Sequence, residues 1–301
     1  MSPIERFKAY LSEINCEYIC DEAMSRHTSF KIGGSADIFI MPRNENDVVD
    51  IINFCKAENV KYYIVGNGSN LLISDEGLRG AVISFGKQFG DIVVKGDTVT
   101  AQAGALLSTV CRFACDNSLG GLEFAFGIPG SVGGAVFMNA GAYGGEMKDV
   151  IVSVRALFPN GEIRDISVYE AGFGYRTSAF QSSGAVILSA DFKLAPRKRN
   201  DIEADMNDII NRRKDKQPLE WPSAGSAFKR PQNGYAAELI DRCGLKGFTV
   251  GGAQVSEKHA GFVINRGGAS CEDVLLLLDK VRSIVFDKTG IMLEAEIKRF
   301  G

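Results

Sequence analysis

Two glycine-rich segments carry the residue types from which a phosphate-binding site can be built. The first spans residues 66–70 (Gly-Asn-Gly-Ser-Asn) and follows an apolar run. The second spans residues 128–134 (Ile-Pro-Gly-Ser-Val-Gly-Gly) within the uncharged stretch 124–145. Glycine lets successive backbone N–H groups point into one concavity, where they can bind the oxygens of a diphosphate. Either segment alone is also compatible with a tight turn, but two such segments in one chain favour a nucleotide-type ligand.

Neither segment matches a standard nucleotide-binding motif. Residue 71 is leucine and no helical pattern follows, so the first segment is not the dinucleotide fingerprint G-x-G-x-x-G. The second segment lacks the Lys-Ser/Thr ending of a P-loop. The stretch 124–145 is long enough to cross a membrane, but seven of its 22 residues are glycine. We therefore interpret it as a buried ligand loop.

The sequence contains no recognisable metal site. Its two histidines are His27 and His259, and none of its seven scattered cysteines forms a C-x-x-C pair. Zinc chemistry of the H-E-x-x-H type is therefore excluded. We expect no metal, and we expect the cysteines to be buried free thiols of a reducing cytosol.

The composition excludes several other classes of protein. The 301 residues include 34 basic and 37 acidic side chains, for a net charge of −3. This balance gives no electrostatic reason to expect a nucleic-acid partner. The first 14 residues carry charges throughout and contain no apolar signal core. We expect a cytoplasmic monomer with small-molecule partners and no membrane partner.

Longer strings around these segments resemble the UDP-N-acetylenolpyruvoylglucosamine reductase family, also called UDP-N-acetylmuramate dehydrogenase. The strings follow the family's order from about residue 26 to residue 298, and the ordered set is far more specific than any one string. They are Val65–Ile73, Gly121–Ala135, Met138–Gly145, His27–Gly34, Tyr175-Arg176-x-Ser178, Pro222–Lys229, Gly252–Ser256, Lys258–Phe262 and Leu293–Glu296. The length resembles that of the shorter of the family's two classes, which lacks an extra substrate-capping loop.

This resemblance implies an α+β fold. An FAD-binding domain of the vanillyl-alcohol-oxidase (PCMH) type, in two subdomains, would be accompanied by a C-terminal α+β substrate-binding domain. The resemblance also implies non-covalent FAD, NADPH as hydride donor and UDP-N-acetylglucosamine enolpyruvate as substrate. The hydride would pass from NADPH to FAD and then to C3 of the enolpyruvyl group. The product would be UDP-N-acetylmuramate, a peptidoglycan precursor needed for cell-wall biogenesis, cell shape and cell division.

The resemblance further implies a set of binding residues. The expected FAD-binding residues are Gly66, Asn67, Gly68, Ser69, Asn70, Leu71, Gly104, Ile128, Pro129, Gly130, Ser131, Gly133, Gly134, Ala140, Gly141, Ala142 and Arg213. The expected substrate-binding residues are Tyr175, Lys216, Lys229 and Lys298. Lys298 stands where some members carry an arginine, and lysine keeps the charge but loses the bidentate fork. The basic run 212–214 is equally compatible with a solvated helix end.

Three residues match the catalytic positions of the family: Arg176, Ser226 and Glu296. A guanidinium binds a carboxylate bidentately, so Arg176 suits the charge that develops on the substrate. A serine hydroxyl is a weak acid, but a C2 carbanion is a strong base, so Ser226 can deliver the proton when it is within reach. Glu296 would stabilise the enolate directly only if protonated, and it would otherwise orient Arg176 or Ser226. Residue alternation alone makes Glu294 an equal candidate, and the resemblance selects Glu296.

Three alternatives remain open from the sequence. An oxidase of the same fold would return its electrons to oxygen, and oxygen consumption without an enolpyruvyl substrate would favour it. A flavin- or nucleotide-binding module without catalysis would tolerate Arg176→Lys or Ser226→Ala. A membrane protein using residues 124–145 would need detergent.

The elements that must position these residues follow from hydrophobic periodicity. Asn44 is expected to cap a helix, Ser270-x-x-Asp273 to form a loose capping box, and Asn160-Gly161 to turn a hairpin. Residues 44–73 are expected to form a β-α-β unit. Helices are expected over 4–14, 44–55, 105–117, 202–214, 235–242 and 270–286. Strands are expected over 61–65, 71–73, 81–85, 91–94, 98–103, 150–158, 162–168, 185–194 and 291–298.

We expect three domains. Residues 1–80 would form the first FAD-binding subdomain. Residues 81–195 would form the second, with residues 290–301 returning to it as a strand. Residues 196–289 would form the substrate-binding domain.

Overall fold

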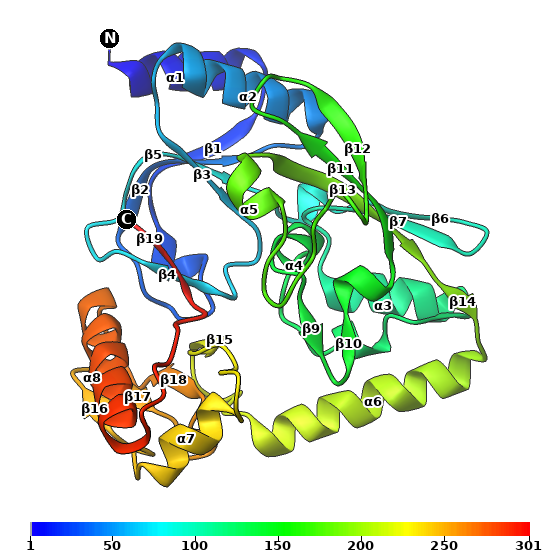
Figure 1. Cartoon of the computed structure of the whole chain (residues 1–301). Coiled ribbons are helices and arrows are strands. Elements are labelled where there is room, and N and C mark those ends of the chain that lie inside the picture. Colours follow the sequence, from blue (N-terminus) through cyan, green and yellow to red (C-terminus); the bar gives the residue numbers. More distant parts are fainter. Residues whose placement is uncertain (1) are drawn as a thin grey trace. The chain divides into compact units, whose positions relative to one another are not determined.

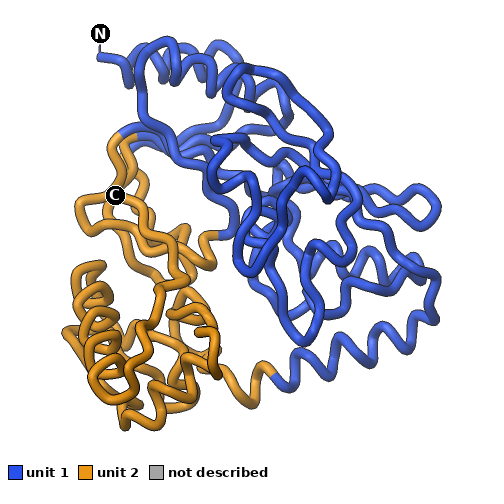
Figure 2. The backbone as a smooth tube through the Cα atoms, viewed as in Figure 1, with its two compact units in different colours: residues 1–20, 38–67, 80–212 blue, residues 21–37, 68–79, 213–301 orange. Residues whose placement is uncertain are grey.

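The structure of the chain, a computed structural model, describes residues 2–301 and divides into two compact units (Figure 2). The first unit comprises residues 1–20, 38–67 and 80–212, and the second comprises residues 21–37, 68–79 and 213–301. Each unit has a hydrophobic core of its own. This division differs from the three expected ranges, because the segment 1–80 is shared between both units.

A five-stranded antiparallel sheet is the largest sheet of the first unit (Figure 1). Its strands, in spatial order, are β12 (Ile163–Ser167), β11 (Ile151–Leu157), β13 (Val186–Lys193), β7 (Thr98–Gln102) and β6 (Ile92–Lys95). The hairpin between β11 and β12 pairs Leu157 with Ile163. Gly161 has a φ of +89°, a conformation that glycine adopts without steric cost. The predicted Asn160-Gly161 hairpin is confirmed.

A second sheet has four strands. In spatial order they are β1 (Glu17–Ala23), β2 (Ser35–Met41), β5 (Leu78–Ser84) and β3 (Tyr62–Val65). The sequence analysis missed β1 and β2. The expected β-α-β unit over 44–73 is wrong in its pairing, because β3 runs parallel to β5 and forms no ladder with residues 71–73. The helix within that segment is confirmed, and its N-cap Asn44 accepts a hydrogen bond from the Asp47 N–H at 2.9 Å.

The remaining elements of the first unit cover and connect these sheets. Its helices are α1 (Pro3–Glu13), α2 (Glu45–Ala57), α3 (Leu107–Asp116), α4 (Val132–Phe137), α5 (Phe180–Ser183) and most of α6 (Arg199–Lys216), with 3₁₀ turns η2 (Lys87–Phe89), η3 (Glu123–Ala125) and η4 (Met147–Asp149). Two short strand pairs complete it: β8 (Leu119–Gly120) with β14 (Ala195–Pro196), and β9 (Gly141–Ala142) with β10 (Gly145–Glu146).

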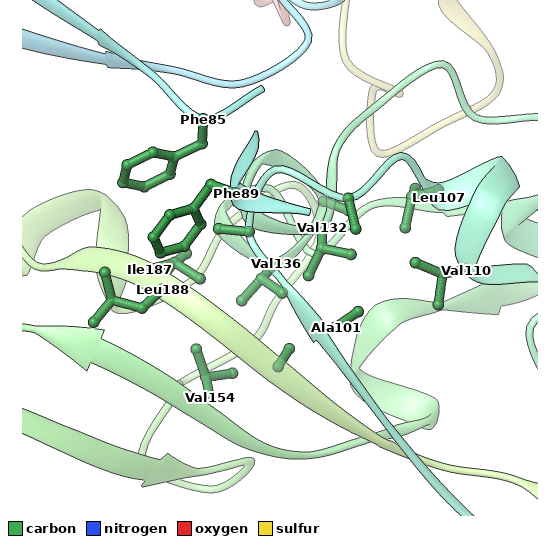
Figure 3. Packing of buried hydrophobic residues seen from close by; sticks show 14 of the residues in the cluster. Phe85, Phe89, Ala101, Leu107, Val110, Val132, Val136, Val154, Ile187 and Leu188 are labelled. Carbon is green, nitrogen blue, oxygen red and sulfur yellow. The ribbon is translucent and has the colours of Figure 1, made fainter. Parts of the chain in front are cut away.

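The uncharged stretch 124–145 contributes directly to the first core. Val132 and Val136 of α4 are fully buried, and they belong to the cluster drawn in Figure 3. Phe85 and Phe89 of this cluster stack with their ring centroids 4.9 Å apart. Burial of these side chains, rather than lipid, explains why this segment lacks charge. Among residues 2–301, no helix combines the length and the apolar composition that crossing a bilayer requires.

The second unit packs two helices against a small antiparallel sheet. The sheet order is β15 (Ser223–Ser226), β18 (Phe262–Asn265), β17 (Ala253–Val255) and β16 (Thr249–Val250). The helices are α7 (Ala236–Arg242) and α8 (Cys271–Thr289), and a 3₁₀ turn, η1 (Met24–Arg26), precedes residues 27–34. The predicted capping box at the start of α8 is confirmed, because the Ser270 hydroxyl accepts the Asp273 N–H and the Asp273 carboxylate accepts the Ser270 N–H.

The predicted strand over 291–298 is wrong for most of its length. Only β19 (Lys298–Phe300) is a regular strand, and it pairs in parallel with β4 (Leu71–Ile73). Residues 291–297 pair only through a single bridge between Ala295 and Phe228. Residues 291–297 therefore have the alternating pattern of a strand but pair with almost no neighbouring strand. The returning segment therefore pairs with residues from the range 1–80, and not with strands of 81–195.

The cysteines are free thiols, as the sequence analysis expected. Six of the seven are buried and Cys20 is half-buried. Burial raises the pKa of Cys55 to about 12 and that of Cys16 to about 11. Thiols with such raised pKa values carry little thiolate and are poor nucleophiles.

Candidate active site

The start of the first glycine-rich segment lies against the second segment within the first unit, which contains residues 66, 67 and 128–134. Gly66 follows β3, and a Cβ on it would lie 2.2 Å from the Ser131 hydroxyl oxygen. The Asn67 side-chain amide donates a hydrogen bond to the Pro129 carbonyl at 2.7 Å. A side chain at position 66 would require the Ser131 hydroxyl to move. The tertiary structure therefore joins two segments that were predicted separately.

The second segment is anchored by the first residue of α3 and by a residue that precedes this helix. The Gly130 carbonyl accepts the Leu107 N–H at 3.0 Å, and the Gly133 N–H donates to the Ala103 carbonyl at 2.8 Å. A Cβ on Gly133 would lie 3.0 Å from the Ala103 Cβ. Ser131 is buried and caps α4 by accepting the Gly134 N–H. Hydrogen bonds and close packing therefore hold this backbone in place.

Gly104 belongs to the same anchored region. Its N–H donates to the Phe89 carbonyl at 2.8 Å, and a Cβ on it would lie 2.3 Å from the Gly86 carbonyl oxygen. The backbone at Gly104 is therefore packed against backbone, and a side chain would displace it. Gly104 is thereby joined to the anchored backbone around the second glycine segment.

The first segment presents a row of unused donors. Within residues 2–301, the backbone N–H groups of residues 66–70 have no hydrogen-bond acceptor. Gly68, in the middle of the row, has a φ of +61°, and a Cβ on it would lie 1.9 Å from the His27 carbonyl oxygen. Successive amides that turn through a left-handed residue form a concave anion-binding nest. These features fit the diphosphate of a dinucleotide such as FAD.

Residues 140–142, which follow the second glycine-rich segment in the chain, contact the candidate catalytic residue Arg176. Gly141 and Ala142 form β9, which pairs with β10 in a tight hairpin. The Gly141 carbonyl accepts a hydrogen bond from the Arg176 guanidinium at 3.2 Å. Arg176 is therefore in direct contact with one of the expected cofactor-binding residues.

Arg176 lies in a tight turn with an unusual backbone conformation. Gly174 and Thr177 exchange two backbone hydrogen bonds of 3.0 and 3.2 Å, which leaves Tyr175 and Arg176 at the tip of the turn. Arg176 has a φ of +55°, which is left-handed. Tyr175 is exposed, and the Arg176 guanidinium lies 5.3 Å from the centroid of its ring. Backbone strain of this kind is found at functional sites.

A carboxylate adds to the electrostatics around Arg176. The hydrogen bond from Lys148 lowers the pKa of the Glu146 carboxyl, and the hydrogen bond from Asn139 and the charge of Arg176 lower it further. The two hydrogen bonds measure 2.9 Å each. Glu146 is thus held as an anion at neutral pH, and it lies within electrostatic reach of Arg176.

The second unit brings Ser226 and Glu296 together. Ser226 is the last residue of β15, is exposed, and follows Gly225, whose φ is +78°. The next residue, Ala227, accepts the Glu296 N–H through its carbonyl at 2.9 Å and donates its own N–H to Gly261 at 2.8 Å. One residue's backbone therefore links the two segments that carry the candidate proton donor and the candidate acid.

The two acids that alternation left equal have different surroundings in the structure. Glu294 forms an ion pair with Lys229 and its side chain is 72% exposed. Glu296 is half-buried, and its carbonyl accepts a hydrogen bond from the Asn70 side chain at 3.4 Å. Asn70 belongs to the first glycine-rich segment. The backbone carbonyl of Glu296 therefore contacts an expected cofactor-binding residue, and Glu296 is less exposed than Glu294.

The other basic candidates lie in α6 and in β19. Arg213 is half-buried in α6, and Lys216 is exposed at its last position. Lys298 is half-buried, and its N–H donates to the Asn70 carbonyl at 3.0 Å. The nearby Lys258 ammonium donates to the Lys214 carbonyl at 2.6 Å, which ties the end of α6 to the loop after β17.

Comparisons with known proteins agree with this geometry. Residues 36–167 match the FAD binding domain family, and residues 217–300 match the family described as UDP-N-acetylenolpyruvoylglucosamine reductase, C-terminal domain. The chain is 49% identical over 287 residues to the UDP-N-acetylenolpyruvoylglucosamine reductase of Clostridium botulinum, covering 95% of this chain and 94% of that protein. The Clostridium perfringens protein of the same name is 48% identical over 93% of this chain and 92% of its own length.

The crystal structure of the reductase from Thermus caldophilus superimposes with a TM-score of 0.81 at 34% identity. It covers 95% of this chain and 99% of that one. The chain belongs to the UDP-N-acetylenolpyruvoylglucosamine reductase family. It is an FAD-containing oxidoreductase of peptidoglycan precursor synthesis. The expected α+β fold, an FAD-binding domain with a C-terminal domain, is confirmed.

Residues 27–34 form a connecting segment whose role was not assigned from the sequence. The Ser29 hydroxyl donates to the Ser223 carbonyl at 2.6 Å, and the Ser29 N–H donates to the Gly68 carbonyl at 3.2 Å. The Asn265 side chain donates to the Phe30 carbonyl at 3.1 Å. Residues 27–34 thus join the first glycine-rich segment to β15, which carries Ser226. The only sequence signal for this role was the family string that begins at His27.

Proposed function

We propose that the chain is an NADPH-dependent reductase that converts UDP-N-acetylglucosamine enolpyruvate to UDP-N-acetylmuramate in the cytoplasm, as a monomer. The observation that carries the proposal is the backbone link through Ala227. This link keeps the segment of Ser226, the proposed proton donor, beside Glu296, which is proposed to act on the charge that develops at C2. Membership of the reductase family supports the substrate and the reaction.

The proposed FAD-binding residues are those named from the sequence: residues 66–71, Gly104, the segments 128–131, 133–134 and 140–142, and Arg213. The free amides of residues 66–70 would hold the diphosphate. Bound FAD would supply the redox chemistry, accepting a hydride from NADPH and delivering it to C3 of the enolpyruvyl group.

Arg176 would neutralise the charge that appears when C3 gains a hydride. That charge develops at C2 and is shared with the substrate carboxylate. A guanidinium remains charged at any working pH and binds a carboxylate through two N–H groups. Tyr175, Lys216, Lys229 and Lys298 are proposed to contact the substrate. The charge of the three lysines would balance that of its diphosphate and carboxylate.

Ser226 would complete the reduction by proton transfer. Its O–H bond breaks as the C2–H bond forms, and the resulting alkoxide regains a proton from solvent. The exposed position of Ser226 at the end of β15 leaves its hydroxyl accessible to a substrate and to water. Glu296 would be the second group that acts on the developing charge at C2.

The decisive test is Ser226→Ala under anaerobic conditions. We expect NADPH to bleach the flavin bands at the wild-type rate, and reoxidation by the enolpyruvyl substrate to slow by about 100-fold or more, the usual contribution of a general acid. Ser223→Ala, in the same strand, is the matched control and should reoxidise normally. Unimpaired reoxidation of Ser226→Ala would exclude its role. Bands that return only with air would favour an oxidase.

A further inference from the structure

The Arg176 turn belongs to a cluster of unfavourable backbone conformations. Eight non-glycine residues among residues 2–301 have a positive φ, and Asn139, Tyr143 and Arg176 are three of them. Left-handed backbone is disfavoured for residues that carry a side chain, so it persists only where surrounding contacts hold it. The contacts that hold Arg176 are therefore part of the site.

Gln181, in α5, holds the strained residue directly. Its side-chain amide donates to the Arg176 carbonyl at 3.0 Å and to the Phe137 carbonyl, at the end of α4, at 2.9 Å. Ser178 donates to the same Phe137 carbonyl at 2.7 Å. The amide of Gln181 therefore ties the backbone of Arg176 to a helix whose apolar side chains are buried in the core.

Asn139 holds the start of the same turn. It is fully buried, and its amide donates to the Gly174 carbonyl at 3.0 Å and to the Glu146 carboxylate at 2.9 Å. Its side-chain oxygen accepts the Lys148 N–H at 2.9 Å. The two ends of the Tyr175–Arg176 turn are thus fixed by two amide side chains from different segments.

We propose that Gln181 and Asn139 are positioning residues that hold the Tyr175–Arg176 turn in its left-handed form, and so aim the Arg176 guanidinium at the substrate carboxylate. This proposal rests on the role of Arg176 given above. Neither amide side chain needs to touch the reacting atoms. Without the bond from Gln181, the turn can relax to conformations in which the guanidinium points elsewhere.

The test replaces Gln181 by methionine, which keeps the length of the side chain and removes its N–H donors. We expect reoxidation of the flavin by substrate to slow about tenfold, the effect of losing one ordinary hydrogen bond that fixes the active geometry. The fall should appear in kcat more than in KM. Flavin content and the rate of reduction by NADPH should stay unchanged, while loss of the hydrogen bonds to the Arg176 and Phe137 carbonyls should lower the midpoint of thermal unfolding only slightly. Ser182→Ala is the matched control, because this exposed serine of α5 donates only to Ala179.

A double-mutant cycle separates this role from a general structural one. We expect Arg176→Ala to slow reoxidation strongly, and Gln181→Met to add nothing in that background, because the two residues act as one unit. Independent, multiplicative effects would overturn the inference. So would wild-type reoxidation by Gln181→Met alone. Normal reoxidation by Arg176→Ala would instead contradict the proposed function.

A second variant covers the case in which Gln181→Met does not fold. Gln181→Asn keeps the amide but is one methylene too short to reach both carbonyls. It should show the same selective loss of the substrate half-reaction in its flavin-loaded form. Equal slowing of both half-reactions would overturn the inference.

Discussion

Gly68→Ala is the change that tests the first glycine-rich segment most directly. Gly68 has a φ of +61°, and a Cβ on it would lie 1.9 Å from the His27 carbonyl oxygen and 3.0 Å from the Thr28 Cα. Cβ atoms do not approach other heavy atoms closer than about 3.0 Å. Because the obstacle is backbone, the segment itself must move by about 1 Å. The amides of residues 66–70 would move with it.

The magnitude has two parts. The left-handed conformation costs an alanine about 1–2 kcal/mol, and overpacking adds about 1–3 kcal/mol, so we expect the free energy of unfolding to fall by about 2–5 kcal/mol. A hydrogen bond to a charged group contributes about 1.5–3 kcal/mol, and 1.4 kcal/mol corresponds to a factor of ten. Misplacing one amide should therefore raise the Kd for FAD by roughly 10- to 100-fold.

The matched control is Gly290→Ala. Gly290 caps α8 in the same compact unit with a φ of +71°, and no atom lies within 4 Å of a Cβ built on it. The Gly290→Ala variant therefore has the cost of a left-handed alanine but no steric clash of its Cβ. The assay is flavin content after purification, FAD affinity by fluorescence titration, and thermal unfolding of both variants. Equal FAD affinity in the two variants would refute the reasoning that the segment must hold its position to bind the cofactor.

Two further predictions follow from the second unit. Glu296→Ala should slow reoxidation of the flavin by substrate about 100-fold. Glu294→Ala removes an exposed partner of Lys229 and should leave the rate within about twofold of wild type. A larger loss in Glu294→Ala than in Glu296→Ala would exchange the roles of the two acids. Hydrogen bonds from the Ser270 N–H and, next, from the Gly252 N–H lower the pKa of the Asp273 carboxyl. The stability that ionised Asp273 contributes is therefore complete above the pKa of this group in the unfolded chain, and it is lost as pH falls through the pKa in the folded chain. Asp273→Asn should show a smaller drop in the midpoint of thermal unfolding between pH 6 and pH 3 than the wild type, and an equal drop would contradict this cause.

Local signals in the sequence were sufficient for many elements. The Asn44 cap, the Asn160-Gly161 hairpin and the Ser270–Asp273 capping box all form as predicted. Each depends on hydrogen bonds between residues a few positions apart, so a short window of sequence contains the whole interaction. The two glycine-rich segments were recognised for the same reason, because positive φ and close backbone approach are properties of single glycines.

Long-range pairing could not be read from one sequence. The alternation over 291–298 has the period of a strand, yet only β19 forms, because pairing needs partner backbone and only β4 supplies it there. For the same reason, the β-α-β unit predicted over 44–73 did not form, because β3 pairs with β5 and not with β4.

The sequence by itself determined which segments turn and cap, and its family strings gave the expected chemistry. The tertiary structure alone decided which segments meet: Gly66 with Ser131, and the backbone of Ala227 with Glu296. It also gave different surroundings to Glu294 and Glu296, which share one alternation. The physical reason is that burial and backbone pairing between distant residues depend on the whole chain, and no local pattern records which partner a segment will find.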